Sequence, residues 1–432
     1  MDVQVEGGRP IRGTFTVPGD KSISHRAVML GCLASGLSTI GGLSTAQDVG
    51  STVRAFQRMG IGIETGADKT EIHGLGIEGF RSGVAANLPD INCENSGTTA
   101  RLLIGLLAGA GKRARLTGDA SLIRRPMLRV VDPLNEHGAC IESTEGRLPV
   151  TLTGAKLLPI HYSVPVPSAQ VKSSLILASL FSEGVSVIVE AQPTRDHTER
   201  LIRYMGGPLV VDITENGIEM RVTGGQKLSS LTMTVPGDIS SAVFFIAAAL
   251  LTPGSSIAIE NVLLNPTRAY ILDVFKRMGA RIDVHVRREH PECVGNVHVR
   301  YSKLTGIGVG GDEIPLIIDE IPALAACALF ARGDTVVRGA GELRVKESDR
   351  IRSIAHMVAA FGGDIEDRQD GFTIHGREGC SAAEVNSFDD HRIAMAASVI
   401  ARASKGTSTI RNAECVDVSF PDFFHLFNRF SG

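Results

Sequence analysis

The sequence is poor in cysteine pairs, in net charge and in long apolar runs, and each shortage excludes a class of protein. Its seven cysteines are scattered and odd in number, with no CxxC pair, so we expect neither a disulfide framework nor a zinc site. The longest apolar run, residues 242–251, is far shorter than the roughly 20 residues that a membrane helix needs. Residues 1–6 lack the basic and apolar regions of a signal peptide. We therefore expect a cytoplasmic protein.

The charge is nearly balanced, with 44 basic and 47 acidic residues and a net charge of −3. This balance predicts no general affinity for nucleic acid or for an anionic membrane, so any cationic site must be local. The motifs GxxxxGK[ST], HExxH and GxSxG do not occur. Residues 306–311 fit GxGxxG, but Asp-Glu-Ile-Pro follows instead of a helix, so we do not expect a dinucleotide site. The length of 432 residues is typical of two or three domains.

One short pattern recurs along the chain, in which a helix ends at a glycine and a strand follows. The repeats are roughly 70 to 80 residues apart, which indicates one supersecondary unit used several times. The glycines are Gly60, Gly138, Gly206, Gly279 and Gly362. Residues 423–427 resemble a last unit that lacks its own strand, and we expect residues 3–5 to supply it.

A second repeat predicts where the chain passes between domains. Residues 17–20 and 235–238 both read Val-Pro-Gly-Asp, which leaves a strand through a Pro-Gly turn and opens a helix. We expect one lobe of residues 1–18 plus 237–432, a second lobe of residues 19–236, and a hinge at residues 17–21 and 235–239. Paired crossings of this kind favour closure on a ligand.

Residues 346–350 contain two acids and two bases directly before an apolar helical pattern that stops at Gly362. We expect Lys346 and Arg350, four residues apart, to lie on one face of the first helical turn. The free N–H groups of that turn and the two cations would bind a phosphate or carboxylate, and Glu347 would be available for proton transfer. An exposed, salt-bridged helix start is the alternative.

Two further segments offer cations. Lys21 stands at the start of a predicted helix that also carries Ser22 and Arg26. Arg125 lies in a basic loop, directly before a proline that could aim its guanidinium at an anion. Each segment also fits an ordinary surface helix or loop.

Two predicted helix starts offer neutral groups. Small residues around Gly97 would let the backbone approach a ligand closely. Ser168 and Gln170 provide hydroxyl and amide groups suited to a polyol. Simple capped turns are the alternative for both.

Asp319 and Arg392 also lie at the starts of predicted helices. Asp319 is either a general base or an acid that complements the helix dipole. Arg392 enters a helix that looks buried and therefore needs a partner, for which Asp390 is the structural candidate. These segments together indicate a two-lobed enzyme for small, multiply anionic substrates. Because cations from two lobes repel each other, we expect a bound anion to drive closure.

Four of these motifs, in this order, resemble the 5-enolpyruvylshikimate-3-phosphate synthase family over essentially the whole chain. They are residues 18–26, 95–101, 344–350 and 390–392. The resemblance implies an α/β (α+β) fold of two lobes. The fold has six repeated βαβαββ units in total, three in each lobe, and each lobe has pseudo-threefold symmetry. It also implies that phosphoenolpyruvate donates its enolpyruvyl group to the 5-hydroxyl of shikimate 3-phosphate, releasing phosphate, in the pathway to chorismate and aromatic amino acids.

The resemblance also implies residue roles. The residues implied for phosphoenolpyruvate are Lys21, Gly97, Arg125, Gln170, Arg350 and Arg392. Those implied for shikimate 3-phosphate are Lys21, Ser22, Arg26, Ser168, Gln170, Arg195, Asp319 and Lys346. Asp319, Glu347 and Lys21 would carry the proton transfers, and no metal or organic cofactor is expected.

The chain departs from many family members at Leu102, Ala169 and Val418, which resembles the more divergent bacterial class. Two other functions stay open at this point. UDP-N-acetylglucosamine enolpyruvyl transferase shares the fold and donor, but typically has Lys-Asn where this chain has Lys21-Ser22, and a cysteine in a loop that here, at residues 111–125, has none. A non-catalytic anion-binding protein is the other. We expect a monomer that binds small molecules.

Overall fold

The computed structural model describes residues 1–430 and divides into two compact units. The central lobe is Gly19–Val235, and the terminal lobe combines Met1–Pro18 with Pro236–Gly432. Each lobe contains three sheets among the described residues. No helix within residues 1–430 has both the length and the apolar character needed to cross a membrane.

The three sheets of the central lobe share one topology: two parallel strands, followed by two strands that each run antiparallel to their neighbour. The first sheet has β14 (Thr232–Thr234), β3 (Ser35–Gly41), β5 (Lys69–Leu75) and β4 (Ile63–Thr65). The second has β6 (Ile91–Asn92), β7 (Arg113–Thr117), β9 (Arg147–Thr153) and β8 (Ile141–Thr144). The third has β10 (His161–Val164), β11 (Val185–Glu190), β13 (Gly217–Thr223) and β12 (Leu209–Thr214).

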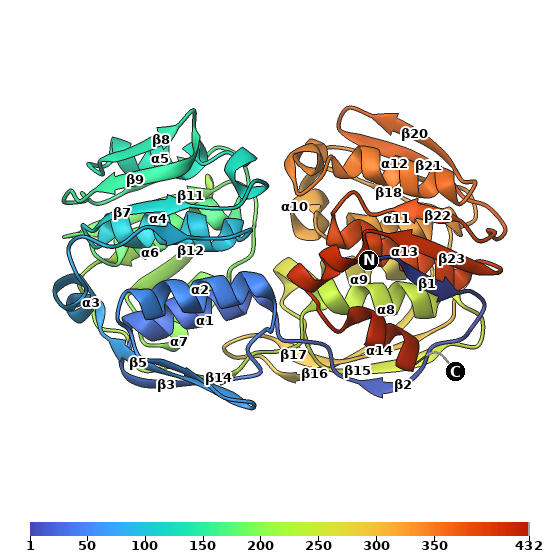
Figure 1. The fold of residues 1–432 in the computed structure, drawn as a ribbon, viewed down its shortest axis with the longest axis horizontal. Helices are drawn as coiled ribbons and strands as arrows, with labels where there is room; N and C mark the ends of the chain where they lie inside the picture. Colours follow the sequence, from blue (N-terminus) through green and yellow to red (C-terminus); the bar gives the residue numbers. More distant parts are fainter. Residues whose placement is uncertain (431–432) are drawn as a thin grey trace. The chain divides into compact units, whose positions relative to one another are not determined.

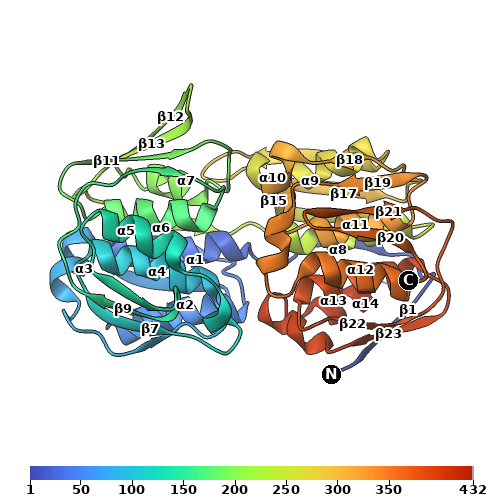
Figure 2. The ribbon, with the colours of Figure 1, turned by 90° about the horizontal axis from the view of Figure 1, so that it is seen from above.

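Three buried helices form the middle of the central lobe, surrounded by the sheets (Figures 1 and 2). They are α1 (Lys21–Leu33), α4 (Gly97–Gly109) and α6 (Ala169–Ser179). Gly105 lets α4 approach α6 closely, because a Cβ there would lie 2.1 Å from the carbonyl oxygen of Ser174. The remaining helices are α2 (Gln47–Arg58), α3 (Ile77–Gly83), α5 (Leu128–Glu136) and α7 (His197–Tyr204), with the 3-10 helix η1 (Leu122–Arg124).

The terminal lobe repeats this topology in two of its sheets, and its third sheet has three strands. Its first sheet has β16 (Arg281–Arg288), β17 (Val294–Arg300), β15 (Ser256–Leu263) and β2 (Arg12–Phe15). Its second has β18 (Gly308–Val309), β19 (Asp334–Val337), β21 (Gly371–His375) and β20 (Asp364–Arg368). Its third has β22 (Glu384–Asn386), β23 (Thr407–Arg411) and β1 (Val3–Glu6). The pairing of Val3 with Ile410 confirms that the N-terminal segment completes the last unit.

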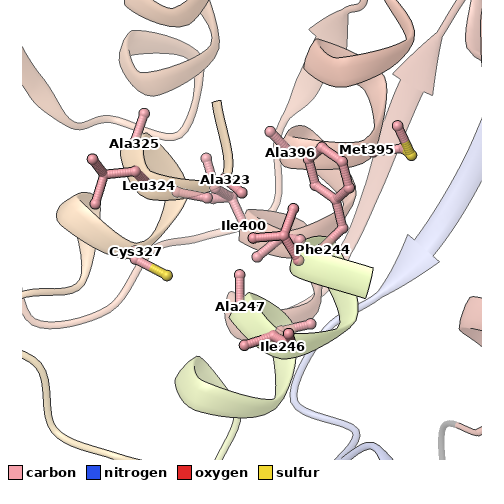
Figure 3. Packing of buried hydrophobic residues seen from close by; sticks show 14 of the residues in the cluster. Phe244, Ile246, Ala247, Ala323, Leu324, Ala325, Cys327, Met395, Ala396 and Ile400 are labelled. Carbon is pink, nitrogen blue, oxygen red and sulfur yellow. The ribbon is translucent and has the colours of Figure 1, made fainter. Parts of the chain in front are cut away.

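The middle of the terminal lobe is also a trio of buried helices, α8 (Ile239–Leu251), α11 (Ile321–Leu329) and α13 (His391–Ala403). Phe244 of α8, Ala323 of α11 and Ile400 of α13 lie close together in Figure 3. Around them lie α9 (Pro266–Arg277), α10 (Ile314–Ile317), α12 (Arg350–Ala360) and α14 (Phe423–Arg429), with the 3-10 helices η2 (Gly311–Glu313), η3 (Gly341–Val345) and η4 (Ala413–Val418).

The repeated glycines have a common backbone reason. All five adopt positive φ, from +69° at Gly206 to +94° at Gly279, just beyond helices α2, α5, α7, α9 and α12. Glycine reaches this left-handed conformation without a steric penalty, which makes it the usual residue after a helix end. The predicted repeat is therefore a repeat of helix terminations.

Candidate active site

Side chains at the N-terminal ends of the three middle helices of the central lobe are hydrogen-bonded to one another. Gln170 of α6 donates from Nε2 to Oγ1 of Thr98 on α4 (3.0 Å) and accepts from Nη1 of Arg101 (2.7 Å). Arg26 of α1 donates from Nη2 to Oγ of Ser173 on α6 (2.7 Å). The three helix starts thus form one polar cluster, which we call the central cluster: Lys21, Ser22, Arg26, Gly97, Arg125, Ser168, Gln170 and Arg195.

Lys21 is the first residue of α1, which Asp20 caps by accepting a hydrogen bond from the Ile23 amide (2.8 Å). Its Nζ lies 3.0 Å from Oδ2 of Asp48, in the first turn of α2. Both side chains are largely buried. The pair holds the ammonium group at the mouth of α1, beside the end of the helix that favours an anion.

Arg26 is buried and ties α1 to α6 and α7. It donates from Nε to Oγ1 of Thr198 (2.7 Å) and from Nη1 to the carbonyl of Ser22 (2.9 Å), one helical turn before it. Arg195, in the loop before α7, donates from Nη1 to Oγ of Ser22 (3.2 Å). The structure therefore brings three of the predicted acceptor-binding residues, Ser22, Arg26 and Arg195, into direct contact.

Gly97 begins α4, and Ser96 caps this helix by accepting from the Thr99 amide (3.1 Å). A Cβ at position 97 would lie 2.9 Å from Nη1 of Arg101 and 3.4 Å from Nη1 of Arg125, so two guanidinium groups border this glycine. Arg125 follows η1 and donates from Nη2 to Oδ1 of Asn95 (2.9 Å).

Ser168 is the N-cap of α6 and accepts from the Val171 amide (3.4 Å). Its capping role, which was the structural alternative, is therefore real. Its position still places the hydroxyl two residues from Gln170, at the same end of α6.

His25 lies behind the central cluster and is uncharged near neutral pH. The pKa of His25 is lowered to about 3, mainly by burial, with Asp48 opposing the shift and the cations Lys21 and Arg26 adding to it. Its Nδ1 is 2.7 Å from Oγ1 of Thr52, which is 2.7 Å from Oγ1 of Thr99. This buried polar chain connects α1, α2 and α4 directly beneath their functional ends.

In the terminal lobe, Arg350 connects several carboxylates. It begins α12 and is 1% exposed. It contacts Oδ2 of Asp390 through Nε (2.8 Å), Oδ1 of Asp319 through Nη1 (3.2 Å) and Oε2 of Glu347 through Nη2. Asp319 and Glu347, distant in sequence and both expected to transfer protons, therefore contact one guanidinium.

Arg392, the second residue of α13, joins the same group. It donates from Nη1 to the carbonyl of Asp319 (2.7 Å), and its guanidinium lies 3.6 Å from Oδ2 of Asp319 and 3.9 Å from Oε1 of Glu320. The structural alternative for Arg392, a side-chain ion pair with Asp390, is not what the structure shows. Asp390 instead caps α13 by accepting from the Arg392 amide (3.0 Å) while its carboxylate binds Arg350.

The predicted helical turn that contains Lys346 is also wrong. The helix starts only at Arg350, with Asp349 as its N-cap, and Lys346 follows the 3-10 helix η3 in an extended conformation. Asp349 accepts from the Arg352 amide (3.1 Å), so a strong local cap sets the helix start later than the charge pattern suggested. We call Asp319, Lys346, Glu347, Arg350 and Arg392 the terminal cluster.

The two arginines of the terminal cluster are paired with carboxylates of the same lobe. Arg350 and Arg392 together contact four carboxylates, those of Asp319, Glu320, Glu347 and Asp390. Protein acids thus offset the charge of these arginines within the terminal lobe, and closure driven by a bound anion stays a prediction. A substrate carboxylate would have to replace protein carboxylates here.

Sequence reasoning missed several supporting residues. Asp48 holds Lys21, Asn95 holds Arg125, and Asp390 holds Arg350. Asn95 and Asp390 lie within the motifs at residues 95–101 and 390–392. Each motif also contains an arginine, which could have indicated that these two residues support a cationic site. Asp48 had no such indication, because only the packing of α2 beside α1 brings it to Lys21.

Comparisons with known proteins agree with this architecture. A family model described as EPSP synthase (3-phosphoshikimate 1-carboxyvinyltransferase) matches residues 5–427. The chain belongs to this family. The 3-phosphoshikimate 1-carboxyvinyltransferase of Pelotomaculum thermopropionicum is 45% identical over 430 residues, covering 99% of this chain and 98% of the relative. That of Caldicellulosiruptor saccharolyticus is 46% identical over 431 residues, covering 99% and 98%.

Solved structures show the same fold. A structure of EPSP synthase from Acinetobacter baumannii has a TM-score of 0.87 and 40% identity, covering 100% of this chain and 98% of that one. The two-lobed enolpyruvyl transferase fold is therefore confirmed. The chain is an enzyme of the shikimate pathway, a 3-phosphoshikimate 1-carboxyvinyltransferase, and the two alternative functions are set aside.

Proposed function

We propose that the central and terminal clusters bind the same two substrates, and that each cluster binds some of the charged groups of these substrates. The residues proposed for phosphoenolpyruvate are Lys21, Gly97, Arg125, Gln170, Arg350 and Arg392. Those proposed for shikimate 3-phosphate are Lys21, Ser22, Arg26, Ser168, Gln170, Arg195, Asp319 and Lys346. Guanidinium and ammonium groups suit the phosphates and carboxylates of these substrates.

The proton transfers follow from the reaction. The 5-hydroxyl oxygen of shikimate 3-phosphate attacks C2 of phosphoenolpyruvate while Asp319 accepts the hydroxyl proton. Glu347 donates a proton to C3 of phosphoenolpyruvate in the same step. The resulting tetrahedral intermediate then loses a proton from C3 to Glu347 and expels phosphate, whose leaving oxygen Lys21 stabilises.

One observation carries this assignment: Asp319 and Glu347 both contact the guanidinium of Arg350, which is proposed to bind the carboxylate of phosphoenolpyruvate. When the substrate carboxylate takes its place on Arg350, it displaces protein carboxylates. Glu347 is then released from the ion pair beside C3, where the reaction needs an acid.

Deuterium transfer from solvent tests the role of Glu347. In heavy water, the unaltered chain adds a deuteron at C3 and then removes one of three hydrogens, so the vinyl group of the product acquires deuterium. Glu347→Gln should reduce both turnover and deuterium incorporation by at least about 10²-fold, while calorimetry still detects binding of shikimate 3-phosphate.

Glu366→Gln is the matched control, because Glu366 lies in the same lobe in an exposed pair with Arg368. Turnover and labelling should be unchanged in this variant. Near-normal labelling in Glu347→Gln would show that another group protonates C3.

We also infer that the enzyme acts in the cytoplasm as a monomer. No disulfide links the seven cysteines, all of which lie within the described residues 1–430, and this suits a reducing compartment. The large exposed apolar side chains, such as Leu158, Ile213 and Val345, are scattered over both lobes. Light scattering should give a mass near 45.8 kDa, and a concentration-dependent larger species would contradict this inference.

A further inference from the structure

A buried ion triad lies beneath the central cluster and has no part in the proposed chemistry. Nζ of Lys172 is 2.6 Å from Oε1 of Glu190 and 2.8 Å from Oε1 of Glu199. The side chains of Lys172, Glu190 and Glu199 are 0%, 3% and 5% exposed. Burying one cation with two carboxylates is unfavourable unless the geometry is well satisfied, so the triad calls for an explanation.

The electrostatics show that the triad is tightly coupled. Burial opposes the charge on Lys172, but the two carboxylates outweigh it and raise the pKa of Lys172. Burial raises the pKa of Glu199, although Lys172 opposes this shift. The second oxygen of Glu199 is buried without a hydrogen bond. The triad is therefore not explained by a large contribution to the stability of the fold.

The triad fixes the loop that carries Arg195. Thr194 donates from Oγ1 to Oε2 of Glu190 (2.6 Å) and from its amide to Oε1 of the same carboxylate (3.3 Å). Nζ of Lys172 also lies 3.5 Å from the carbonyl of Thr194. The next residue is Arg195, whose guanidinium reaches Ser22.

The triad also fixes the surroundings of Arg26. Glu199 lies in the first turn of α7 beside Thr198, and Lys172 precedes Ser173 on α6. Thr198 and Ser173 are bonded to each other through their hydroxyls (2.8 Å), and both accept hydrogen bonds from Arg26. An ion pair between Lys172 and Glu199 thus clamps the two elements that orient this arginine.

We propose that Lys172, with Glu190 and Glu199, is a positioning centre for the phosphorylated acceptor: it sets Arg195 and Arg26, and its loss weakens binding of shikimate 3-phosphate more than binding of phosphoenolpyruvate. This inference rests on the proposed assignment of Arg26 and Arg195 to the acceptor. Arg125 and Gly97, proposed for the donor, are held instead by Asn95 and by the start of α4.

The test compares the KM values of the two substrates in the full-length enzyme, measured by phosphate release. Lys172→Met should raise the KM for shikimate 3-phosphate at least about tenfold, since small displacements of binding groups have effects of up to about 10². The KM for phosphoenolpyruvate, at saturating acceptor, should change less than about twofold. Lys172→Arg, which keeps the charge, should recover most of the loss. Lys156→Met, in the exposed pair with Glu183 in the same lobe, is the control and should match the unaltered enzyme.

A second variant covers the case in which Lys172→Met does not fold. Thr194→Val removes the 2.6 Å hydrogen bond to Glu190 but keeps the shape and all charges. It should raise the KM for the acceptor severalfold with the KM for the donor unchanged. Equal increases in both KM values, or no increase in Thr194→Val, would overturn the proposal. An unaltered chain that releases no phosphate with shikimate 3-phosphate would instead refute the proposed function.

Discussion

Arg350 and Asp390 form a fully buried ion pair in the terminal lobe, with Nε and Oδ2 2.8 Å apart and the two side chains 1% and 0% exposed. Asp390 has two structural tasks at once, because its other oxygen caps α13. The pair therefore links the first residue of α12 to the first turn of α13. It fixes the direction of a guanidinium that also contacts Asp319 and Glu347.

Asp390→Asn separates these two tasks. Asparagine caps helices well, so the α13 cap should survive while the buried charge is lost. We expect the free energy of unfolding to fall by about 3 kcal/mol, the cost of breaking a buried pair, and the KM for phosphoenolpyruvate to rise as Arg350 loses its orientation. Urea unfolding and steady-state kinetics measure the two effects. Glu366→Gln, at an exposed pair, should cost no more than about 1 kcal/mol. Equal stability of the two variants would contradict the structural role of Asp390.

Gly97→Ala tests the close approach of two guanidinium groups to α4. The new Cβ would meet Nη1 of Arg101 at 2.9 Å and Nη1 of Arg125 at 3.4 Å. Both contacts are to the ends of flexible side chains, so the fold should remain while Arg125 shifts. We expect the KM for phosphoenolpyruvate to rise about tenfold or more, with little change in the KM for shikimate 3-phosphate. Gly50→Ala places a Cβ 3.0 Å from Nη1 of Arg54 in α2 and should leave both KM values unchanged.

Gly105→Ala tests the packing between α4 and α6. The added Cβ would lie 2.1 Å from the carbonyl oxygen of Ser174, a backbone atom that cannot move without moving α6. We expect a loss of about 1–3 kcal/mol in the free energy of unfolding, as for other overpacked cores. Gly83→Ala, at the last residue of α3 with open space around it, should be neutral or slightly stabilising. An unaffected Gly105→Ala would mean that the two helices separate easily.

His25 predicts a pH dependence of stability with a definite sign. Burial lowers its pKa from 6.5 to about 3 in the folded protein. Between these values the unfolded chain binds a proton that the folded chain does not. Stability from this group is therefore present above pH 6.5 and is lost as the pH falls towards 3, by at most about 1.4 kcal/mol per pH unit.

His25→Gln removes this contribution, so its destabilisation relative to the unaltered protein should shrink as the pH falls from 7.5 to 4. His375→Gln is a control of opposite sign. The hydrogen bond that Nδ1 of His375 donates to Asp334 raises the pKa of His375. The stability that His375 contributes is therefore present below its unfolded pKa and is lost at higher pH. The measurement is the urea midpoint of unfolding across this pH range. If the midpoints of His25→Gln and of the unaltered protein change in parallel with pH, His25 is not neutral and buried in the folded protein.

Features that depend on short stretches of chain could be predicted from the amino-acid sequence alone. Positive-φ glycines after helices, Ser or Asp caps such as Ser168 and Asp20, and the alternation of strands follow local steric and hydrogen-bonding rules. Several residues of the two clusters lie in first helical turns, as their motifs predicted: Lys21, Gly97, Gln170, Arg350 and Arg392. Local rules failed where two were in competition, as at Lys346, where the cap at Asp349 rather than the charge spacing decided where α12 begins.

Which charged side chains meet depends on contacts between segments that are far apart in the chain. Arg350 forms ion pairs with Asp390, Asp319 and Glu347. Lys172 forms ion pairs with Glu190 and Glu199. No rule of spacing along the sequence predicts these partners. The physical reason is that burial makes an unpaired charge costly, so each partner is set by the loops that the repeated topology brings to the same helix end.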